Sequence, residues 1–100
     1  MLVIVWEYMA RTDRLAEFET LYSPDGAWVK LFKNSPGFVS TTLMRDIKDP
    51  NRFVIADRWM SEESYEAFKH EFAGDFEKLT TRGERLHRAE HLIGHFDFVE

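Results

Sequence analysis

Cysteine is absent from the 100-residue sequence. Its absence excludes disulfide bonds, thiolate metal sites and a cysteine nucleophile, and it fits a reducing compartment. Long apolar runs are absent as well, since no stretch approaches the roughly 20 residues that a membrane helix needs. The N-terminus lacks the positively charged region of a signal peptide. We therefore expect a cytoplasmic protein that does not contact membranes.

Positive charge is scarce. The chain has 13 Lys and Arg against 18 Asp and Glu, for a net charge of −5 and a sequence pI of about 5.3. This balance argues against a nucleic-acid partner, because such proteins carry basic patches. A glycine-rich phosphate loop, a serine nucleophile motif and paired catalytic carboxylates are also missing from the sequence. Phosphate binding by such a loop, catalysis by a serine nucleophile and catalysis by a carboxylate pair are thereby excluded.

Hydrophobic and aromatic residues are plentiful instead. Hydrophobic residues make up 44% of the chain and charged residues 31%, which is typical of a globular protein. We expect one domain over residues 1–100. Fifteen percent of the residues are aromatic, and nine are Phe. Aromatic side chains in such numbers either pack a core or line a pocket for a flat ligand.

Both faces of three expected strands are apolar. A sheet with helices on one side and water on the other should alternate between apolar and polar residues. A chain of this length has enough helix to cover one face, so the other face needs a partner, most simply a second copy. The opposing sets are Leu2, Ile4, Trp6 and Tyr8 against Val3, Val5 and Met9; Phe53, Ile55 and Trp59 against Val54, Ala56 and Met60; and Leu92, Phe96 and Phe98 against Ile93 and Val99.

The pattern predicts four strands, over residues 2–9, 38–45, 53–60 and 91–99, with a helical region after the first and another after the third. Ser23-Pro24-Asp25-Gly26 interrupts the first helical region. Ser61 is a suitable N-cap for the second, and Gly74 is a point where that helix can bend or break. The stretch 80–90 fits either helix or loop. An apolar stripe along the second helix consists of Tyr65, Phe68, Phe72, Phe76 and Leu79.

This order, βαββαβ, predicts an α+β ferredoxin-like fold with a four-stranded antiparallel sheet. Three segments also resemble the antibiotic biosynthesis monooxygenase (ABM) superfamily of dimeric α/β barrels. They are Phe18-Glu19-Thr20-Leu21-Tyr22, Ser35-Pro36-Gly37-Phe38, and the run from Asp57-Arg58-Trp59 through Ser61 to Phe68. The resemblance implies a homodimer. Its members include cofactor-free oxygenases of aromatic polyketides, heme-degrading monooxygenases and isomerases of small signal molecules.

The resemblance also implies site residues. The aromatic polyketide oxygenases have a Trp at a strand end and a Tyr six residues later, which correspond to Trp59 and Tyr65. The Asn that they place shortly before the Trp falls near Ile55 and is missing. Heme-degrading members use an Asn, a Trp and a His where this chain has Glu7 or Tyr8, Phe68 and Lys78. Those replacements argue against heme degradation.

We predict Trp59 and Tyr65 as catalytic residues, and Glu7, Phe68 and His70 as substrate-binding residues. The alternative for Trp59, Tyr65 and Phe68 is ordinary core packing. Glu7 interrupts an apolar strand and lies either in a pocket, with a raised pKa, or at a wet edge. His70 lies off the apolar stripe and faces solvent or the edge of a groove.

Three histidines, His87, His91 and His95, are spaced by four, with Glu90 among them. On a helix this spacing would suggest a metal site. In a strand, residues four apart lie about 13 Å from each other. We therefore predict no metal. Any single histidine of the chain can act as a general base near neutral pH.

The resemblance implies a cofactor-independent monooxygenase that acts on a small aromatic or polyketide-like molecule in a hydrophobic pocket. The alternatives are a non-catalytic dimer that binds a small hydrophobic molecule and a structural or stress-related dimer without a ligand. A polar group aimed into the pocket beside Trp59 would favour the enzyme. A wholly apolar pocket would favour the binding protein, and a filled pocket would favour the structural role.

Overall fold

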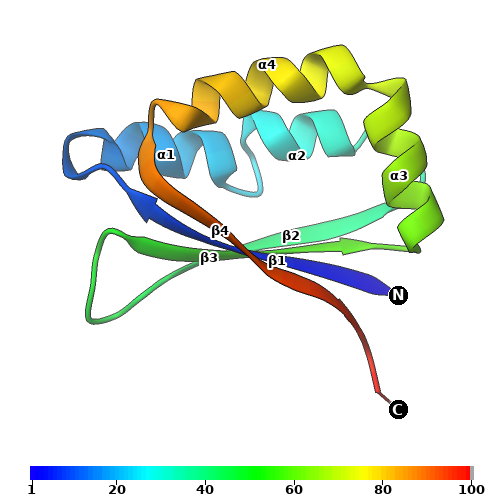
Figure 1. The fold of residues 1–100 in the computed structure, drawn as a ribbon, viewed down its shortest axis with the longest axis horizontal. Coiled ribbons are helices and arrows are strands. Elements are labelled where there is room, and N and C mark those ends of the chain that lie inside the picture. The colour runs from blue at the N-terminus through cyan, green and yellow to red at the C-terminus, as the bar shows by residue number, and fades with distance from the viewer. Residues whose placement is uncertain (100) are drawn as a thin grey trace.

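A computed structural model of the chain describes residues 1–99. One antiparallel sheet carries its helices on a single face (Figure 1). No helix in this range is long and apolar enough to cross a membrane. The elements are β1 (Leu2–Ala10), a 3₁₀ turn (Thr12–Arg14), α1 (Leu15–Tyr22), α2 (Ala27–Phe32), β2 (Phe38–Arg45), β3 (Arg52–Trp59), α3 (Glu62–Glu71), α4 (Ala73–Glu84) and β4 (His87–Asp97).

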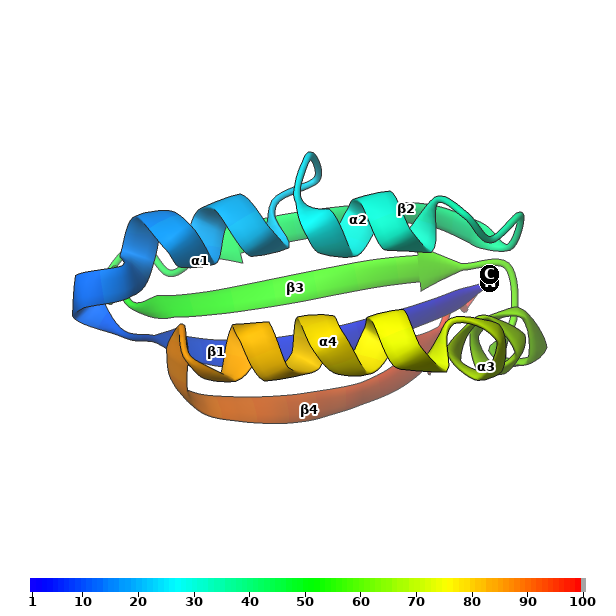
Figure 2. The same cartoon turned by 90° about the horizontal axis from the view of Figure 1, so that it is seen from above.

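The sheet has the strand order β2-β3-β1-β4, and every neighbouring pair is antiparallel. The two central strands, β1 and β3, pair in register from Leu2 opposite Trp59 to Met9 opposite Arg52. Seen from above, α1 and α2 follow β2 and β3, whereas α4 runs over β1 and β4 (Figure 2). The predicted ferredoxin-like α+β fold with a four-stranded antiparallel sheet is confirmed.

The first helical region divides where the sequence predicts it. α1 ends at Tyr22 and α2 begins at Ala27. Gly26 is required between them, because a Cβ at this position would lie 2.4 Å from the carbonyl oxygens of Thr20 and Leu21. The interruption lets two short helices each turn an apolar side onto the sheet, with Phe18 of α1 among the fully buried side chains.

The second helical region begins as expected and breaks earlier than expected. The Ser64 N–H donates to the Ser61 hydroxyl oxygen at 3.1 Å, which is an N-cap hydrogen bond. The chain leaves the helical conformation at Phe72, two residues before Gly74. The predicted stripe is thus shared between two helices. Phe68 of α3 is buried in the core, and Phe76 of α4 is only partly buried.

The last strand departs most from the sequence prediction. It begins at His87 instead of His91, and it contains two bulges. In one of them Ile93 is the extra residue, since Val5 pairs with Gly94 and Trp6 with Leu92. Leu92 therefore shares the helix-covered face with Trp6, whereas Phe96 pairs with Val3 on the other face. The prediction that Leu92 and Phe96 share one face was wrong, because a bulge reverses the alternation of side chains.

The core consists of two buried clusters between the sheet and the helices. One lies around Tyr8, Phe18 and Phe53, and the other around Ile4, Trp59 and Phe68. Trp6 and Trp28 are partly buried and pack against both clusters. The space between the two clusters is not completely filled, and this is where the candidate site lies.

Candidate functional site

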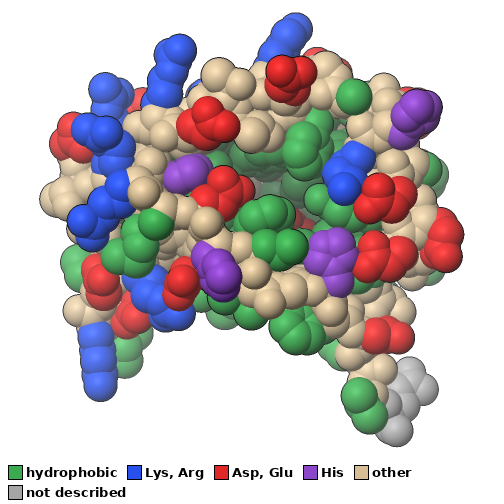
Figure 3. Space-filling model, viewed as in Figure 1, with side chains coloured by type: hydrophobic (Ala, Val, Ile, Leu, Met, Phe, Trp, Pro, Cys, Tyr) green, Lys and Arg blue, Asp and Glu red, His purple; other side chains and the backbone are tan. Residues whose placement is uncertain are grey.

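A cavity of about 210 Å³ lies between the sheet and the helices. Its volume is below the roughly 300–1,000 Å³ of drug-sized ligand sites, so it suits a molecule of one or two rings. Figure 3 shows the cavity opening as a hollow with hydrophobic walls. The lining residues are Trp6, Tyr8, Tyr22, Trp28, Phe32, Thr41, Ile55, Asp57, Tyr65, Phe76, Thr80, His87 and Glu90.

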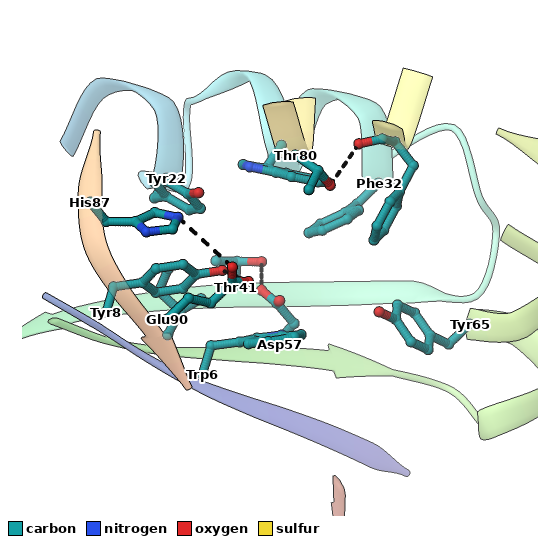
Figure 4. Close-up of a pocket in the computed structure, with 13 residues that line it drawn as sticks. Trp6, Tyr8, Tyr22, Phe32, Thr41, Asp57, Tyr65, Thr80, His87 and Glu90 are labelled. Carbon is teal, nitrogen blue, oxygen red and sulfur yellow. Dashed lines mark hydrogen bonds and ion pairs between the residues drawn. The ribbon is translucent and has the colours of Figure 1, made fainter. Parts of the chain in front are cut away.

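Asp57 is a carboxylate in the sheet wall of this mainly apolar cavity. It belongs to the helix-covered side of β3, between Ile55 and Trp59, and it is 7% exposed. The Thr41 hydroxyl of the paired strand β2 donates to its Oδ1 atom at 2.6 Å (Figure 4). Among residues 1–99, Asp57 is the one charged residue that is buried, and it forms no ion pair.

Burial raises the pKa of Asp57 from 3.8 to about 6, although the hydrogen bond from Thr41 acts in the opposite direction. The carboxyl group is therefore ionised at neutral pH and is more basic than an exposed aspartate. A base is most effective when its pKa lies near the working pH. Position and basicity together make Asp57 a candidate general base.

Tyr65 lines the cavity beside Asp57 and comes from the first turns of α3. Its hydroxyl group points toward the cavity in Figure 4. The ring centroid lies 5.2 Å from that of Trp59, and the Lys69 ammonium stands 4.7 Å from the Tyr65 ring. Burial, with a smaller contribution from Asp57, raises the pKa of Tyr65, so its hydroxyl stays protonated and able to donate.

A second polar group lies at another part of the cavity wall and consists of Tyr8, His87 and Glu90. The Tyr8 hydroxyl donates to Glu90 Oε1 at 3.2 Å, and His87 Nε2 lies 3.9 Å from Glu90 Oε2. Burial raises the pKa of Tyr8 and lowers that of His87. The histidine is therefore neutral at neutral pH.

A bulge makes this second group possible. His87 and Glu90 are three residues apart, and a regular strand would turn them to opposite faces. In β4, His87 pairs with Ala10 and Ala89 with Met9, so Arg88 is an extra residue. The bulge brings both side chains to the helix-covered face.

The five predicted site residues lie in different surroundings. Tyr65 lines the cavity. Trp59 is completely buried behind it, and Phe68 is also a core residue. Glu7 lies on the opposite face of the sheet, where Arg52 Nη2 approaches its carboxylate at 2.6 Å. His70 is exposed near the end of α3. The structure thus places Trp59, Tyr65 and Phe68 together and leaves Glu7 and His70 apart from them.

Asp57 was not predicted as a site residue, although it belongs to a segment that resembles the ABM superfamily. A signal for it exists, because Phe53, Ile55 and Trp59 alternate as inward residues and Asp57 occupies the remaining inward position. The His87–Glu90 pair had no comparable signal, since it depends on a bulge that residue types do not reveal.

The three spaced histidines do not converge. His87 faces the cavity, His91 pairs with Glu7 on the opposite face, and His95 Nδ1 lies 2.7 Å from a carboxylate oxygen of Glu62. Within residues 1–99, no group of three or more potential ligands is close enough to hold a metal ion.

The fold and site define a ferredoxin-like α+β domain whose sheet and helices enclose an aromatic-lined cavity with a buried carboxylate. Comparison with family models then gives the assignment. The chain belongs to the antibiotic biosynthesis monooxygenase family, whose model matches residues 1–73. The resemblance noted in the sequence is confirmed. No curated protein sequence matches the chain.

Several solved structures share the fold. SnoaB, a cofactor-independent oxygenase from Streptomyces nogalater, has a TM-score of 0.83 and 21% identity, over 99% of this chain and 93% of that chain. A putative antibiotic biosynthesis monooxygenase from Deinococcus radiodurans has a TM-score of 0.79 and 13% identity, over 100% and 94%. A putative antibiotic biosynthesis monooxygenase from Bordetella bronchiseptica has a TM-score of 0.79 and 18% identity, over 99% of this chain and 97% of that chain.

Proposed function

We propose that this protein is a cofactor-independent monooxygenase that acts on a small phenolic or polyketide-like ring. The observation that carries the proposal is the Asp57 carboxylate, buried in the wall of an otherwise mainly aromatic cavity. Burying a carboxylate is costly, and a site that only bound an apolar molecule would gain nothing from it. The similarity in fold to SnoaB, described as a cofactor-independent oxygenase, is consistent with this function.

In the proposed reaction, Asp57 removes the proton of a phenolic hydroxyl group. The resulting anion is electron-rich enough to reduce dioxygen. A ring carbon that carried hydrogen becomes a carbonyl carbon, one oxygen atom is retained there, and the other leaves as water. The phenol plus O₂ thus gives a quinone plus H₂O, and the substrate supplies all four electrons. No cofactor is needed for this balance.

Each side chain near the ring has a proposed role. Tyr65 donates a hydrogen bond to the substrate oxygen and holds the ring against Asp57. Trp59 supports the Tyr65 ring from behind and keeps water out of that end of the site. Thr41 fixes the orientation of the carboxylate. In this scheme Glu7, Phe68 and His70 do not touch the substrate.

Oxygen uptake with a panel of naphthols tests the proposal. Asp57→Asn keeps the shape of the side chain and removes its basicity, so we expect turnover to fall by about 100-fold or more. In the unchanged protein, kcat/KM should rise as the pH passes through about 6, where Asp57 ionises.

Asp75→Asn is the matched control, because Asp75 is exposed on α4 and lies outside the cavity. It should leave uptake unchanged. Undiminished uptake in Asp57→Asn would remove Asp57 from catalysis. Binding of the naphthols without any oxygen uptake would favour the non-catalytic binding protein instead.

We also propose that two copies pair through the uncovered face of the sheet. Apolar side chains on this face include Val3, Val5 and Val54, and they continue to Met44 on β2 and Phe96 on β4, which are 45% and 48% exposed. Exposed apolar patches of this kind commonly mark protein interfaces. A second copy offers the same surface, so the two apolar faces can cover each other across a twofold axis.

A further inference from the structure

We propose that His87 and Glu90 form a second ligand-binding end of the cavity, which selects rings that carry an oxygen on the side remote from Asp57. The inference rests on the proposed function, since it concerns which phenols enter the same cavity. It assigns to the two residues a role in specificity and not in the oxidation itself.

The first observation is that His87 is partly buried in the cavity wall and makes no hydrogen bond through its ring. Its side chain is 8% exposed and lines the cavity, and its ring packs 5.0 Å from that of Tyr8. Within residues 1–99, neither ring nitrogen takes part in a hydrogen bond. The ring nitrogens are therefore free to bond a ligand oxygen in the cavity.

The second observation is the spacing between His87 and Glu90. Nε2 and Oε2 are 3.9 Å apart, which is too long for a direct hydrogen bond. The other oxygen of Glu90 is held by the Tyr8 hydroxyl at 3.2 Å, so the carboxylate is fixed in place. A ligand hydroxyl between them could donate to Glu90 and accept from a neutral imidazole N–H.

The third observation is the distance of this pair from Asp57 within the sheet. Glu90 pairs with Tyr8, and Asp57 pairs with Ile4, so the two residues start from strands on opposite sides of β1, at backbone positions four residues apart along it. Trp6 lies between them and provides an aromatic surface. A flat ligand on that surface would meet a polar group at each end.

Two naphthol probes separate this inference from simple apolar binding. One is 1-naphthol, and the other is a dihydroxynaphthalene with one hydroxyl on each ring. Quenching of tryptophan fluorescence reports binding, because Trp6 and Trp28 line the cavity. We expect the dihydroxy compound to bind about tenfold more tightly, as is typical of one added hydrogen bond to a charged group.

His87→Phe keeps an aromatic ring and should abolish this preference, because it weakens binding of the dihydroxy compound much more than binding of 1-naphthol. Glu90→Gln tests the same end independently if the first variant folds poorly. His70→Phe is the matched control, since His70 is exposed and lies outside the cavity, and it should keep the full preference.

Equal affinity for both probes in the unchanged protein would overturn the inference. A preference that persists in both His87→Phe and Glu90→Gln would overturn it as well. The same holds if the variants lose affinity for both probes and melt at a lower temperature, because that result would indicate a structural role. Oxygen uptake is measured separately. If the preference for the dihydroxy compound depends on His87 but no oxygen is consumed, the inference is supported and the oxygenase function is overturned. If oxygen is consumed but the preference is absent, the oxygenase function is supported and the inference is overturned.

Discussion

Asp57 is the residue at which stability and function oppose each other. Its carboxylate stands on the inward side of β3, where Phe53, Ile55 and Trp59 hold the other positions. Water would solvate the ionised group better than the hydrogen bond from Thr41 does, and the raised pKa expresses that difference. The charged form therefore weakens the fold, and a neutral side chain of the same shape should strengthen it.

Replacement of Asp57 by Asn should raise the free energy of unfolding at neutral pH by about 3 kcal/mol, since a pKa difference of one unit corresponds to about 1.4 kcal/mol. The folded pKa lies above the unfolded one, so the native state binds more protons between pH 3.8 and about 6. The stability that Asp57 contributes is complete below this window and is lost as the pH rises through it.

Denaturant titrations of the two proteins at several pH values measure this effect. The difference between them should be near zero in acid and should grow until the pH exceeds about 6. Comparison of the two proteins cancels the contributions of other groups, such as Asp46 and Asp97, whose pKa values are lowered by hydrogen bonds. A difference that does not change with pH would mean that Asp57 is solvated.

At the scale of the elements, alternation and spacing predicted the first three strands to within one residue at each end. They did so because inward and outward residues of these strands follow the regular period of two. β4 was predicted less well. Its bulges change the period locally, and counting alternate residues from His91 onward cannot detect an extra residue.

The second helical region illustrates another limit. Tyr65, Phe68, Phe72 and Phe76 repeat at helical spacing and read as one stripe, although the helix breaks at Phe72. The spacing of apolar residues predicts which side of a helix is buried. It does not predict whether the helix axis continues in one direction. For the same reason the cavity could not be located from the sequence, since it lies where the stripe leaves the core and Phe76 becomes part of the lining.

The broken stripe predicts unequal effects of two phenylalanine substitutions. Phe68 is 1% exposed and contacts Phe32, Trp59 and Phe72, whereas Phe72 is only partly buried at the break. Phe68→Ala should destabilise the protein by about 3–5 kcal/mol, and Phe72→Ala by less than half of that. Denaturant unfolding measures both. Equal losses would indicate that α3 and α4 pack as one continuous helix.

At the scale of the whole molecule, the helices cover one face of the sheet, and the other face is open (Figure 1). The apolar character of that second face was visible in the sequence, because Val3, Val5 and Val54 alternate with core residues. The open face also carries charge, since Glu7, Arg52 and Asp46 form ion pairs there. A paired surface would surround these charges with apolar contacts.

The proposed pairing predicts a molecular mass of about twice the 11.9 kDa of the chain in dilute solution. An interface of this apolar kind should bury roughly 2,000 Å² or more. Phe96→Glu places a charge on the uncovered face and should shift the protein toward monomers, whereas Glu63→Gln on α3 should not. Light scattering distinguishes the states, and a stable monomer of the unchanged chain would contradict the proposal.

The bulge at Arg88 has a consequence for how this site tolerates changes in chain length. His87 belongs to the cavity because one additional residue separates it from Glu90 in β4. Deleting Arg88 would preserve every other side chain and still turn the imidazole to the far side of the sheet. In a lineage of such proteins, the polar end of the cavity could thus appear or vanish through a single-codon insertion or deletion. An alignment that scores identities alone would register only a gap.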